Sequence, residues 1–401
     1  MTRPDRITAD WLTAPASRAV MAALEAARKD ASRYVGGSVR NTLRGVKADD
    51  VDIATQLLPQ ETVAALEAAA IRVIPTGLEH GTVTAFYKGV PIEITTLRRD
   101  VETDGRRAVV AFTQDWAEDA ARRDFRMNAI YAGPEGELYE VIPGSIEDAL
   151  AGRVIFIGEG DQRLIEDYLR ILRFYRFNAW YGAGIDEDGQ GACARQREGL
   201  RKIAAERIWK ELKRTLAAPD PSAALRAMQE AGVLDVILPA ATADSLPGLA
   251  AIEAANALAP DPMQRLMALL PRRQRDVSEA ASALRLSNQE AARLQAWADP
   301  ALGHVLALGA AARREAFYRF GPQTVLDRAL IEAASGGEGT LAPILQDKAS
   351  WMRPVFPVTG DDALAAGLKG AEIGKRLHTL EQAWIASGFR LSREDLVSRL
   401  K

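Results

Sequence analysis

Hydrophobic residues in the first third of the chain follow two patterns. Between residues 15 and 30, apolar side chains recur at a helical spacing, whereas later short runs rich in β-branched residues lie between turn formers. These runs predict strands at 32–35, 51–54, 71–74, 82–87 and 91–96. Helices are expected between them at 38–45 and 58–70. The pattern indicates a short mixed sheet covered by helices.

The rest of the chain is dominated by helical spacing. Residues 98–114 are highly charged and show no clear period, so we expect a mobile loop there. One long helix is predicted from Gly160 to Trp180, and beyond residue 218 alanine- and leucine-rich helices are separated by proline and glycine. The predicted fold class is α+β and multidomain, with an α/β part followed by all-helical parts. We place these parts at 1–145, 146–217 and 218–401.

Composition fits several folded domains. The chain has 401 residues and is 48% hydrophobic, enough for sizeable cores. Its one cysteine, Cys193, cannot form an internal disulfide. The first residues carry charges where a signal peptide needs an apolar run, and no window reaches the length of a membrane span. We therefore expect a cytoplasmic protein with neither a membrane partner nor a disulfide partner.

The overall charge does not indicate a nucleic-acid partner. The formal net charge is −3 at pH 7. Residues 194–214 nevertheless hold eight Lys or Arg residues against three Glu residues. Such a run is either a solvated helix face or a track for phosphate groups, because local charge matters more than the total.

Candidate chemistry begins at a glycine pair, Gly36 and Gly37. The short helix that follows would direct its N-terminal amides at this turn, a geometry that attracts phosphate oxygens. Asp50 and Asp52 lie two residues apart in a predicted strand, so their side chains would share one face and one divalent cation. Glu93, in the last predicted strand, is a candidate third acidic ligand. Each feature alone also fits a loop, a solvated turn or a surface glutamate.

Two further clusters suit a nucleotide. Arg122 and Arg123 could clamp a polyphosphate while Asp124 accepts a ribose hydroxyl, although a helix-capping salt bridge is the alternative. The other cluster lies at i, i+3 and i+4 spacings on one face of the predicted helix 160–180. Its members are Glu166, Asp167, Arg170 and Arg173. Such side chains either pair with one another at the surface or read the edges of bases.

Five segments, in this order, resemble the bacterial-type class II tRNA nucleotidyltransferase and poly(A) polymerase family. They read VGGSVRNTLRG, DDVDIAT, RRDFRMNAI, EDYLRILRFYRF and AERIWKEL and lie within residues 33–216. The helical remainder matches in character and in its segment PVTGDD. The resemblance implies a nucleotidyltransferase head followed by an all-helical neck, body and tail.

The resemblance also implies residue roles. Asp50 and Asp52 would be catalytic and would hold Mg²⁺ for nucleotidyl transfer. The residues implied to contact the triphosphate and ribose are Gly36, Gly37, Arg40, Arg122, Arg123 and Asp124. Those implied to select the base are Glu166, Asp167, Arg170 and Arg173, with Asp167 and Arg170 pairing to CTP or ATP. Those implied to grip the acceptor stem of tRNA are Arg195, Arg197, Arg201, Lys202, Arg207 and Lys210.

Two residues depart from the family pattern. Asn41 stands where the family usually has Asp, and Arg126 stands where it has a smaller hydroxyl residue. We expect altered packing or nucleotide affinity rather than loss of chemistry, because both metal-binding aspartates are present.

The resemblance leaves several activities open. The first is template-independent addition of CMP and AMP to the 3′ end of tRNA, and the loop 98–114 is implied to help switch from C to A addition. A poly(A) polymerase and an A-only or CC-only enzyme share the same motifs. A non-catalytic RNA-binding protein on this scaffold is the alternative from another class, and loss of either aspartate would favour it.

Overall fold

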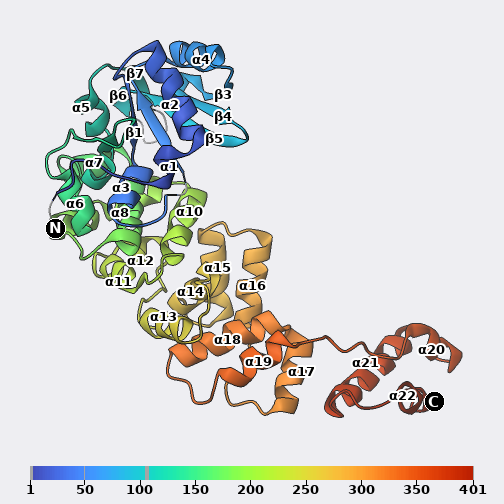
Figure 1. The fold of residues 1–401 in the computed structure, drawn as a ribbon. Helices are drawn as coiled ribbons and strands as arrows, with labels where there is room; N and C mark the ends of the chain where they lie inside the picture. Colours follow the sequence, from blue (N-terminus) through green and yellow to red (C-terminus); the bar gives the residue numbers. More distant parts are fainter. Residues whose placement is uncertain (1–2, 49, 104–107, 401) are drawn as a thin grey trace. The chain divides into compact units, whose positions relative to one another are not determined.

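The computed structural model describes residues 3–48, 50–103 and 108–400. The chain forms two compact units, Met1–Pro239 (unit 1) and Ala240–Lys401 (unit 2). Unit 1 carries the β-sheets together with helices, whereas the elements of unit 2 are helices throughout its described residues (Figure 1). The predicted fold class is confirmed.

Unit 1 is built on a seven-stranded sheet with strand order β3-β4-β5-β2-β1-β8-β9. Its strands are β1 (Ser32–Val35), β2 (Asp52–Thr55), β3 (Arg72–Gly77), β4 (Thr82–Tyr87), β5 (Val90–Thr96), β8 (Ile130–Ala132) and β9 (Leu138–Glu140). The pair β2 and β5 is parallel and the other neighbouring pairs are antiparallel, so the sheet is mixed as predicted. The sequence pattern missed β8 and β9, because three residues are too few to show a period.

The register of the sheet separates its two faces. Tyr34, Ile53, Ile94 and Val83 lie in one row across four strands and are at most 1% exposed. This row packs against the helix α2 (Pro15–Ala27), since the Tyr34 hydroxyl donates to the backbone oxygen of Ser17 in that helix. Asp52 and Glu93 lie in the next row and therefore face the other way. The carboxylates are thus on the face that α2 does not cover.

Helices surround this sheet and continue beyond it. Those of unit 1 are α1 (Asp10–Thr13), α2 (Pro15–Ala27), α3 (Gly37–Leu43), α4 (Pro59–Ala68), α5 (Trp116–Ala121), α6 (Ser145–Ala151), α7 (Gly160–Glu166), α8 (Leu169–Tyr181), α9 (Glu187–Gln196), α10 (Ala205–Leu216), α11 (Ser222–Glu230) and α12 (Val233–Ile237). Figure 1 shows α2 and α4 against the β3, β4 and β5 side of the sheet, where they pack. The buried residues of α2, including Val20, Met21 and Leu24, recur at the spacing that the sequence predicted.

Two predicted elements are wrong. The expected loop at 98–114 is an antiparallel hairpin of β6 (Arg98–Thr103) and β7 (Ala108–Phe112), while residues 104–107 lie outside the described residues. The expected single helix from Gly160 to Trp180 is divided into α7 and α8. The chain is extended at Asp167, with φ −152° and ψ 104°, and this conformation ends α7. Charged residues masked the strand pattern in the first case, and continuous helix formers hid the break in the second.

The boundary between the compact units differs from a predicted joint. We predicted a joint at 217/218, but α11 packs on α8, and α12 packs on the 3₁₀-helix η3 (Arg197–Lys202). Both helices therefore belong to unit 1, which ends at Pro239. The division into parts 1–145, 146–217 and 218–401 stays a prediction.

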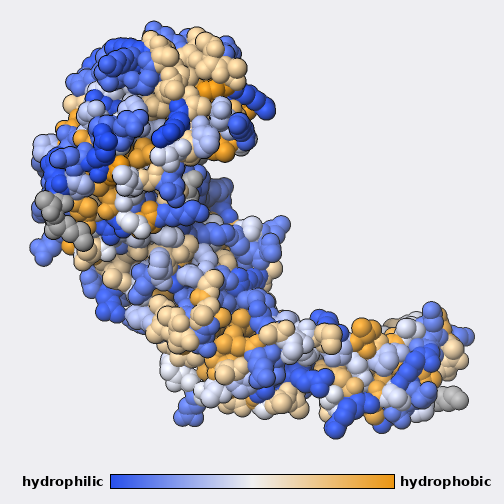
Figure 2. Space-filling model, viewed as in Figure 1, coloured by the Kyte–Doolittle hydropathy of each residue, from blue (hydrophilic) through white to orange (hydrophobic). Residues whose placement is uncertain are grey.

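Unit 2 is organised around α18. Its helices are α13 (Leu246–Ala255), α14 (Pro262–Leu269), α15 (Gln274–Ala283), α16 (Asn288–Ala298), α17 (Ala310–Phe320), α18 (Pro322–Ala334), α19 (Ala342–Ala349), α20 (Gly360–Ala365), α21 (Ala371–Ala386) and α22 (Arg393–Ser398). Five of these, α13, α14, α16, α17 and α19, pack on α18. Among the described residues no helix is long and apolar enough to span a bilayer, and Figure 2 shows hydrophilic residues spread over the visible face of each unit.

Candidate active site

A glycine turn joins β1 to α3. Gly36 adopts φ 75° and ψ −124°, which side chains of L residues rarely allow, so glycine is required there. A β-carbon placed on Gly36 would lie 3.9 Å from Nη1 of Arg123, and one on Gly37 would lie 3.8 Å from Nη2 of Arg40. Two guanidinium groups therefore flank the backbone of this turn.

Asp52 is the first residue of β2, beside its register partner Glu93 in β5. Burial, together with the charges of Glu93 and Asp50, raises the pKa of Asp52 to about 6, whereas Arg123 acts to lower it. Asp50 is exposed and lies before the strand, so the predicted strand 51–54 is wrong at its start. We predicted that Asp50 and Asp52 share one face of a strand. Asp50 instead lies in the segment before β2, and this segment brings it near Asp52.

The start of the central strand β2 suits a hard cation. Burial is the largest cause of the raised pKa of Asp52, and the negative charges of Glu93 and Asp50 add to it. Mg²⁺ commonly binds one or two carboxylates and takes its remaining ligands from water and phosphate oxygens. The described part of the chain contains no group of three or more His, Cys, Asp or Glu side chains that could hold a metal ion. Asp50 and Asp52 fit Mg²⁺ together with substrate oxygens, and Glu93 as a third ligand stays a prediction.

A cavity of about 630 Å³ lies beside the turn and β2. The predicted nucleotide-site residues that line it are Gly36, Gly37, Arg40, Asp52, Arg122, Arg123, Asp124, Asp167, Arg170 and Arg173. Arg207, which was predicted to contact RNA, lines it as well. The sequence did not point to four further lining residues, Arg98, Asn128, Leu169 and Phe177. Segments far apart in the sequence thus meet around one space.

Asp119 holds Arg122 and Arg123, and it was not among the residues predicted for the site. Its carboxylate is 1% exposed and accepts from Nη2 of Arg122 at 2.7 Å, from Nη2 of Arg123 at 2.9 Å and from the Tyr131 hydroxyl at 2.9 Å. Burial acts to raise the pKa of Asp119, but the charges of Arg123 and Arg122 outweigh it and lower the pKa to about 2. The spacing of a carboxylate three and four residues before an arginine pair is the signal that could have identified it.

Asp124 is buried and fully engaged. One oxygen accepts from Nη2 of Arg173 at 2.5 Å, and the other accepts from Nδ2 of Asn128 at 2.9 Å and from its neighbour's backbone N–H. Burial opposes ionisation, but the charge of Arg173 and these hydrogen bonds keep the pKa of Asp124 lowered. The structure therefore shows Asp124 as the partner of Arg173, and its contact with a ribose stays a prediction.

The four residues predicted to select the base lie around the break between α7 and α8. Oε2 of Glu166 accepts from Nη1 of Arg170 at 2.7 Å and from Nη1 of Arg163 at 2.5 Å. Asp167 accepts from the Leu169 backbone N–H at 3.1 Å and from Nη2 of Arg207 at 3.2 Å. Glu166 does not line the cavity, and it contacts the cavity only through its pair with Arg170. Asp167 and Arg170 present a carboxylate and a guanidinium to the same space.

The basic segment is spread over α9, η3 and α10. Arg195 pairs with Asp161 at 2.6 Å, and Arg201 pairs with Glu198 at 2.7 Å. The Lys202 ammonium lies 5.2 Å from the ring centre of Tyr168. Arg207 is placed at the cavity, whereas Lys210 is exposed on α10. The role of the six predicted residues in RNA binding stays a prediction.

Arg126, one of the two departures from the family pattern, packs between elements. Its Nε lies 2.5 Å from Oδ2 of Asp148 in α6, whose other oxygen is 2.8 Å from Nε of Arg153. Asp148 is 0% exposed, so two arginines neutralise one buried carboxylate. The guanidinium of Arg126 does not line the cavity. Whether this packing differs from that of the family's usual smaller residue stays a prediction.

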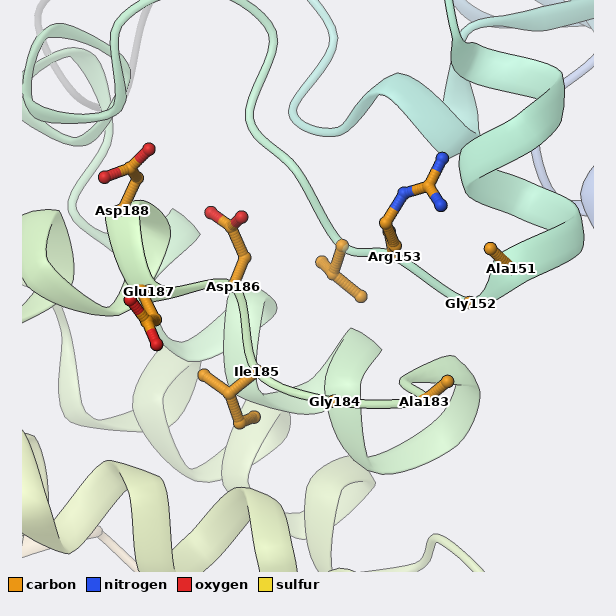
Figure 3. Close-up of a pocket in the computed structure, with 10 residues that line it drawn as sticks. Ala151, Gly152, Arg153, Ala183, Gly184, Ile185, Asp186, Glu187 and Asp188 are labelled. Atoms are coloured by element: carbon orange, nitrogen blue, oxygen red, sulfur yellow. The ribbon is translucent and has the colours of Figure 1, made fainter.

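A second cavity, of about 530 Å³, is separate from the site (Figure 3). It lies between residues 151–154 and 183–188, and none of the predicted site residues lines it. Asp186 caps α9 here, since Oδ2 accepts from the Gly189 backbone N–H at 2.8 Å. Asp186, Glu187 and Asp188 bring three acidic side chains to its wall, which does not suit a phosphate group.

Comparison with known proteins gives two matches to family models. Residues 32–155 match the model described as Poly A polymerase head domain. Residues 184–245 match the model described as Probable RNA and SrmB- binding site of polymerase A. The first match covers the sheet, the turn and both aspartates.

Related proteins extend over nearly the whole chain. The mitochondrial CCA tRNA nucleotidyltransferase 1 of Mus musculus is 34% identical over 393 residues, which cover 92% of this chain and 86% of that protein. The Homo sapiens protein of the same name is 33% identical over 394 residues, with the same coverage. The CCA-adding enzyme of Geobacillus kaustophilus is 34% identical over 221 residues, or 54% of this chain and 51% of that enzyme.

Solved structures share the fold. The CCA-adding enzyme of Bacillus stearothermophilus in complex with CTP has a TM-score of 0.72, 24% identity and 96% coverage of both chains. The Thermotoga maritima CCA-adding enzyme complexed with tRNA has a TM-score of 0.70, 18% identity and 98% coverage of both chains. An arginine-lined cavity beside the central strand that begins with Asp52 suits a nucleotidyltransferase, and the relatives show that class. The chain belongs to the CCA tRNA nucleotidyltransferase family.

Proposed function

We propose that this protein adds CMP and AMP to the 3′ end of tRNA, from CTP and ATP, without a nucleic-acid template and with release of pyrophosphate. The observation that carries this proposal is the convergence of charge around one cavity. Asp52 lies at one side, and Arg40, Arg122, Arg123, Arg170 and Arg173 line the rest together with Asp167. A carboxylate beside several guanidinium groups is what a metal-bound triphosphate requires.

The residues near the glycine turn would bind the triphosphate. Arg40 and Arg123 flank the turn, and Asp119 fixes the direction of Arg122 and Arg123. Guanidinium groups held in this way stabilise charge that develops on phosphate oxygens and on the leaving pyrophosphate. Asp50 and Asp52 would hold Mg²⁺, which when bound lowers the cost of deprotonating the RNA 3′-hydroxyl and neutralises phosphate charge.

The break after α7 would supply base choice. Asp167 offers two acceptor oxygens and Arg170 offers a fork of donors, and both line the cavity. Arg207 donates to Asp167 and Arg170 donates to Glu166, so a base would compete with these partners. CCA-adding enzymes of this fold have been solved in complex with CTP and with ATP, which supports both as substrates here.

A tRNA partner is supported by the names of the relatives and by one solved complex with tRNA. Arg195, Arg197, Arg201, Lys202 and Lys210 are the proposed contacts to its acceptor stem, with shape and phosphates as the recognised features. Whether the protein is cytoplasmic stays a prediction, because two relatives are named as mitochondrial.

The test uses the full chain, tRNA that lacks its 3′ CCA, labelled CTP and ATP, and Mg²⁺. We expect two C residues and one A residue to be added, and we expect Asp52→Asn to add none while it still binds tRNA. Incorporation of A alone, equally well onto an unrelated RNA, would instead establish the poly(A) polymerase alternative. Binding of tRNA without incorporation of either nucleotide by the wild-type protein would favour a non-catalytic RNA-binding protein.

A further inference from the structure

Arg163, in α7, contacts the backbone of the arginine pair that is proposed to bind the triphosphate. Its side chain is 11% exposed. Nη2 donates to the backbone oxygens of Arg122 and Arg123, both at 2.7 Å. Carbonyl oxygens that are partly removed from water need such partners, so these contacts stabilise the course of the chain at the pair. Asp119 holds the side chains of Arg122 and Arg123, and Arg163 holds the backbone of the same two residues.

The same guanidinium also contacts the residues that are proposed to select the base. Nη1 of Arg163 donates to Oε2 of Glu166 at 2.5 Å, and Nη1 of Arg170 donates to that same oxygen at 2.7 Å. Arg170 also donates to the backbone oxygen of Arg163 at 2.8 Å and to that of Arg122 at 3.3 Å. Each of these three acceptors belongs to Arg163 or accepts from its guanidinium. The direction of Arg170 therefore depends on Arg163 in all three contacts.

Arg163 acts through its neighbours. It does not line the cavity, whereas Arg122 and Arg170 do. Glu166 carries one negative charge between two guanidinium groups, so the carbonyl oxygens contribute to holding both of them. The planar fork of arginine reaches a carboxylate on one side and carbonyl oxygens on the other, whereas a lysine ammonium is a compact point charge. This set of contacts therefore requires arginine.

We infer that Arg163 is a positioning residue that fixes the direction of Arg170 and joins the choice of base to the backbone of Arg122 and Arg123. The inference rests on the proposed function and deepens it. The base and the triphosphate are parts of one nucleotide, so a residue that holds both sets of contacts sets the position of one relative to the other. Loss of Arg163 should weaken triphosphate binding slightly and the preference for the correct base more strongly.

The first test is equilibrium binding of CTP, UTP and inorganic tripolyphosphate to the full chain with Mg²⁺, measured by calorimetry. UTP carries a carbonyl group where CTP carries an amino group, so the two bases differ in the donors and acceptors that Asp167 and Arg170 would contact. Arg163→Met removes the guanidinium and keeps an unbranched side chain. We expect it to lower the preference for CTP over UTP roughly tenfold and to weaken tripolyphosphate binding about threefold. Arg163→Lys keeps the charge but loses the fork, so it should lower the preference at least about threefold and weaken tripolyphosphate binding about twofold.

Arg313→Met is the matched control. Arg313 lies in unit 2, is 13% exposed and donates to the carboxylate of Asp347 at 2.8 Å and to the backbone oxygen of Leu308 at 2.7 Å. It therefore resembles Arg163 in burial and in the kinds of acceptor that it contacts. Its removal should leave the CTP preference and the tripolyphosphate affinity unchanged.

The second test is a double-mutant cycle with Arg170→Ala. Because Arg163 is inferred to act on the base through Arg170, Arg163→Met should change the CTP preference by less than about twofold when Arg170→Ala is already present. The loss of tripolyphosphate affinity should remain in the double variant, because the contacts of Arg163 with Arg122 and Arg123 do not involve Arg170. A general disturbance of the fold would instead weaken CTP and UTP equally.

An unchanged CTP preference in Arg163→Met, or in Arg163→Lys if the methionine variant does not fold, would overturn the role in base choice. A loss of preference that persists at full size beside Arg170→Ala would overturn it as well. Unchanged tripolyphosphate binding in the folded variant would overturn the link to Arg122 and Arg123. Failure of the proposed function gives a different result: the wild-type protein would bind CTP in preference to UTP but would not extend tRNA that lacks its 3′ CCA.

Discussion

Asp119→Asn tests whether one buried carboxylate directs both arginines of the proposed triphosphate site. The substitution keeps the size of the side chain and removes its charge. Its new NH₂ group would face Arg122, Arg123 or the Tyr131 hydroxyl, which all donate to Asp119 in the wild-type protein. The variant therefore leaves donors unpaired in a place where the wild-type carboxylate is 1% exposed.

The expected loss follows from the pKa of Asp119. Its two arginine partners outweigh burial and lower the pKa from 3.8 to about 2, which corresponds to about 2.4 kcal/mol of folding free energy at neutral pH. Because the folded-state pKa is depressed, this stability is present above pH 3.8 and is lost as the pH falls toward 2. At pH 3, about 1.3 kcal/mol should remain.

The free energy of unfolding of unit 1 is measured by urea titration at pH 7 and at pH 3. Hydrogen exchange of peptides from α5 and β8 monitors the unfolding. Asp115→Asn is the control, because Asp115 is exposed, begins the same helix and caps it by accepting from the Ala117 N–H at 2.8 Å. Asparagine caps helices about as well as aspartate, so the control should lie within about 0.5 kcal/mol of wild type. A variant Asp119→Asn as stable as this control, or a loss that is equal at both pH values, would refute the reasoning.

Two further predictions concern the proposed metal site at Asp50 and Asp52 and the choice of base. Asp52→Asn should abolish nucleotide addition. In the absence of metal it should also raise the free energy of unfolding by about 1–3 kcal/mol at pH 7. The gain is expected because the pKa of the wild-type carboxylate is raised to about 6 in the folded protein, so its ionised form destabilises the fold at pH 7. Thermal melts should show this gain fully above pH 6 and fading toward pH 4, and a loss of stability at pH 7 would contradict it. Arg170→Ala should change the ratio of kcat/KM for CTP and ATP by about tenfold or more, measured by labelled addition, while Arg201→Ala, whose partner Glu198 is also exposed, should not. An unchanged ratio in Arg170→Ala would argue against its role in base choice.

Local signals in the sequence located much of the site. The strands β1 and β4 have the predicted bounds, since alternation and turn formers coincide there. The predicted turn lies at Gly36, because its positive φ needs glycine, and Gly37 begins α3. The arginines and aspartates were recognised by residue type and order, and the cavity brings most of them together.

Other features depend on contacts that sequence spacing does not reveal. Asn128 became part of the site only through its bonds to Arg40 and Asp124 across the fold. The break at Asp167 is set by tertiary packing, which overrode a run of helix-forming residues. Asp119 was overlooked because its role is to support other side chains, and residue type alone does not separate this from surface pairing.

The parallel pairing of β2 with β5 bears on how the site forms during folding. Asp52 and Glu93 meet through this pairing, although α4, β3 and β4 lie between them in the sequence. A contact between distant segments closes late, because the loop entropy must be overcome first. Glu93 can therefore join Asp52 only once β5 has been made and has paired with β2. A nascent chain that ends before β5 already contains its glycine turn and both aspartates, and β1 can pair with β2, but it lacks the strand that brings Glu93 to them.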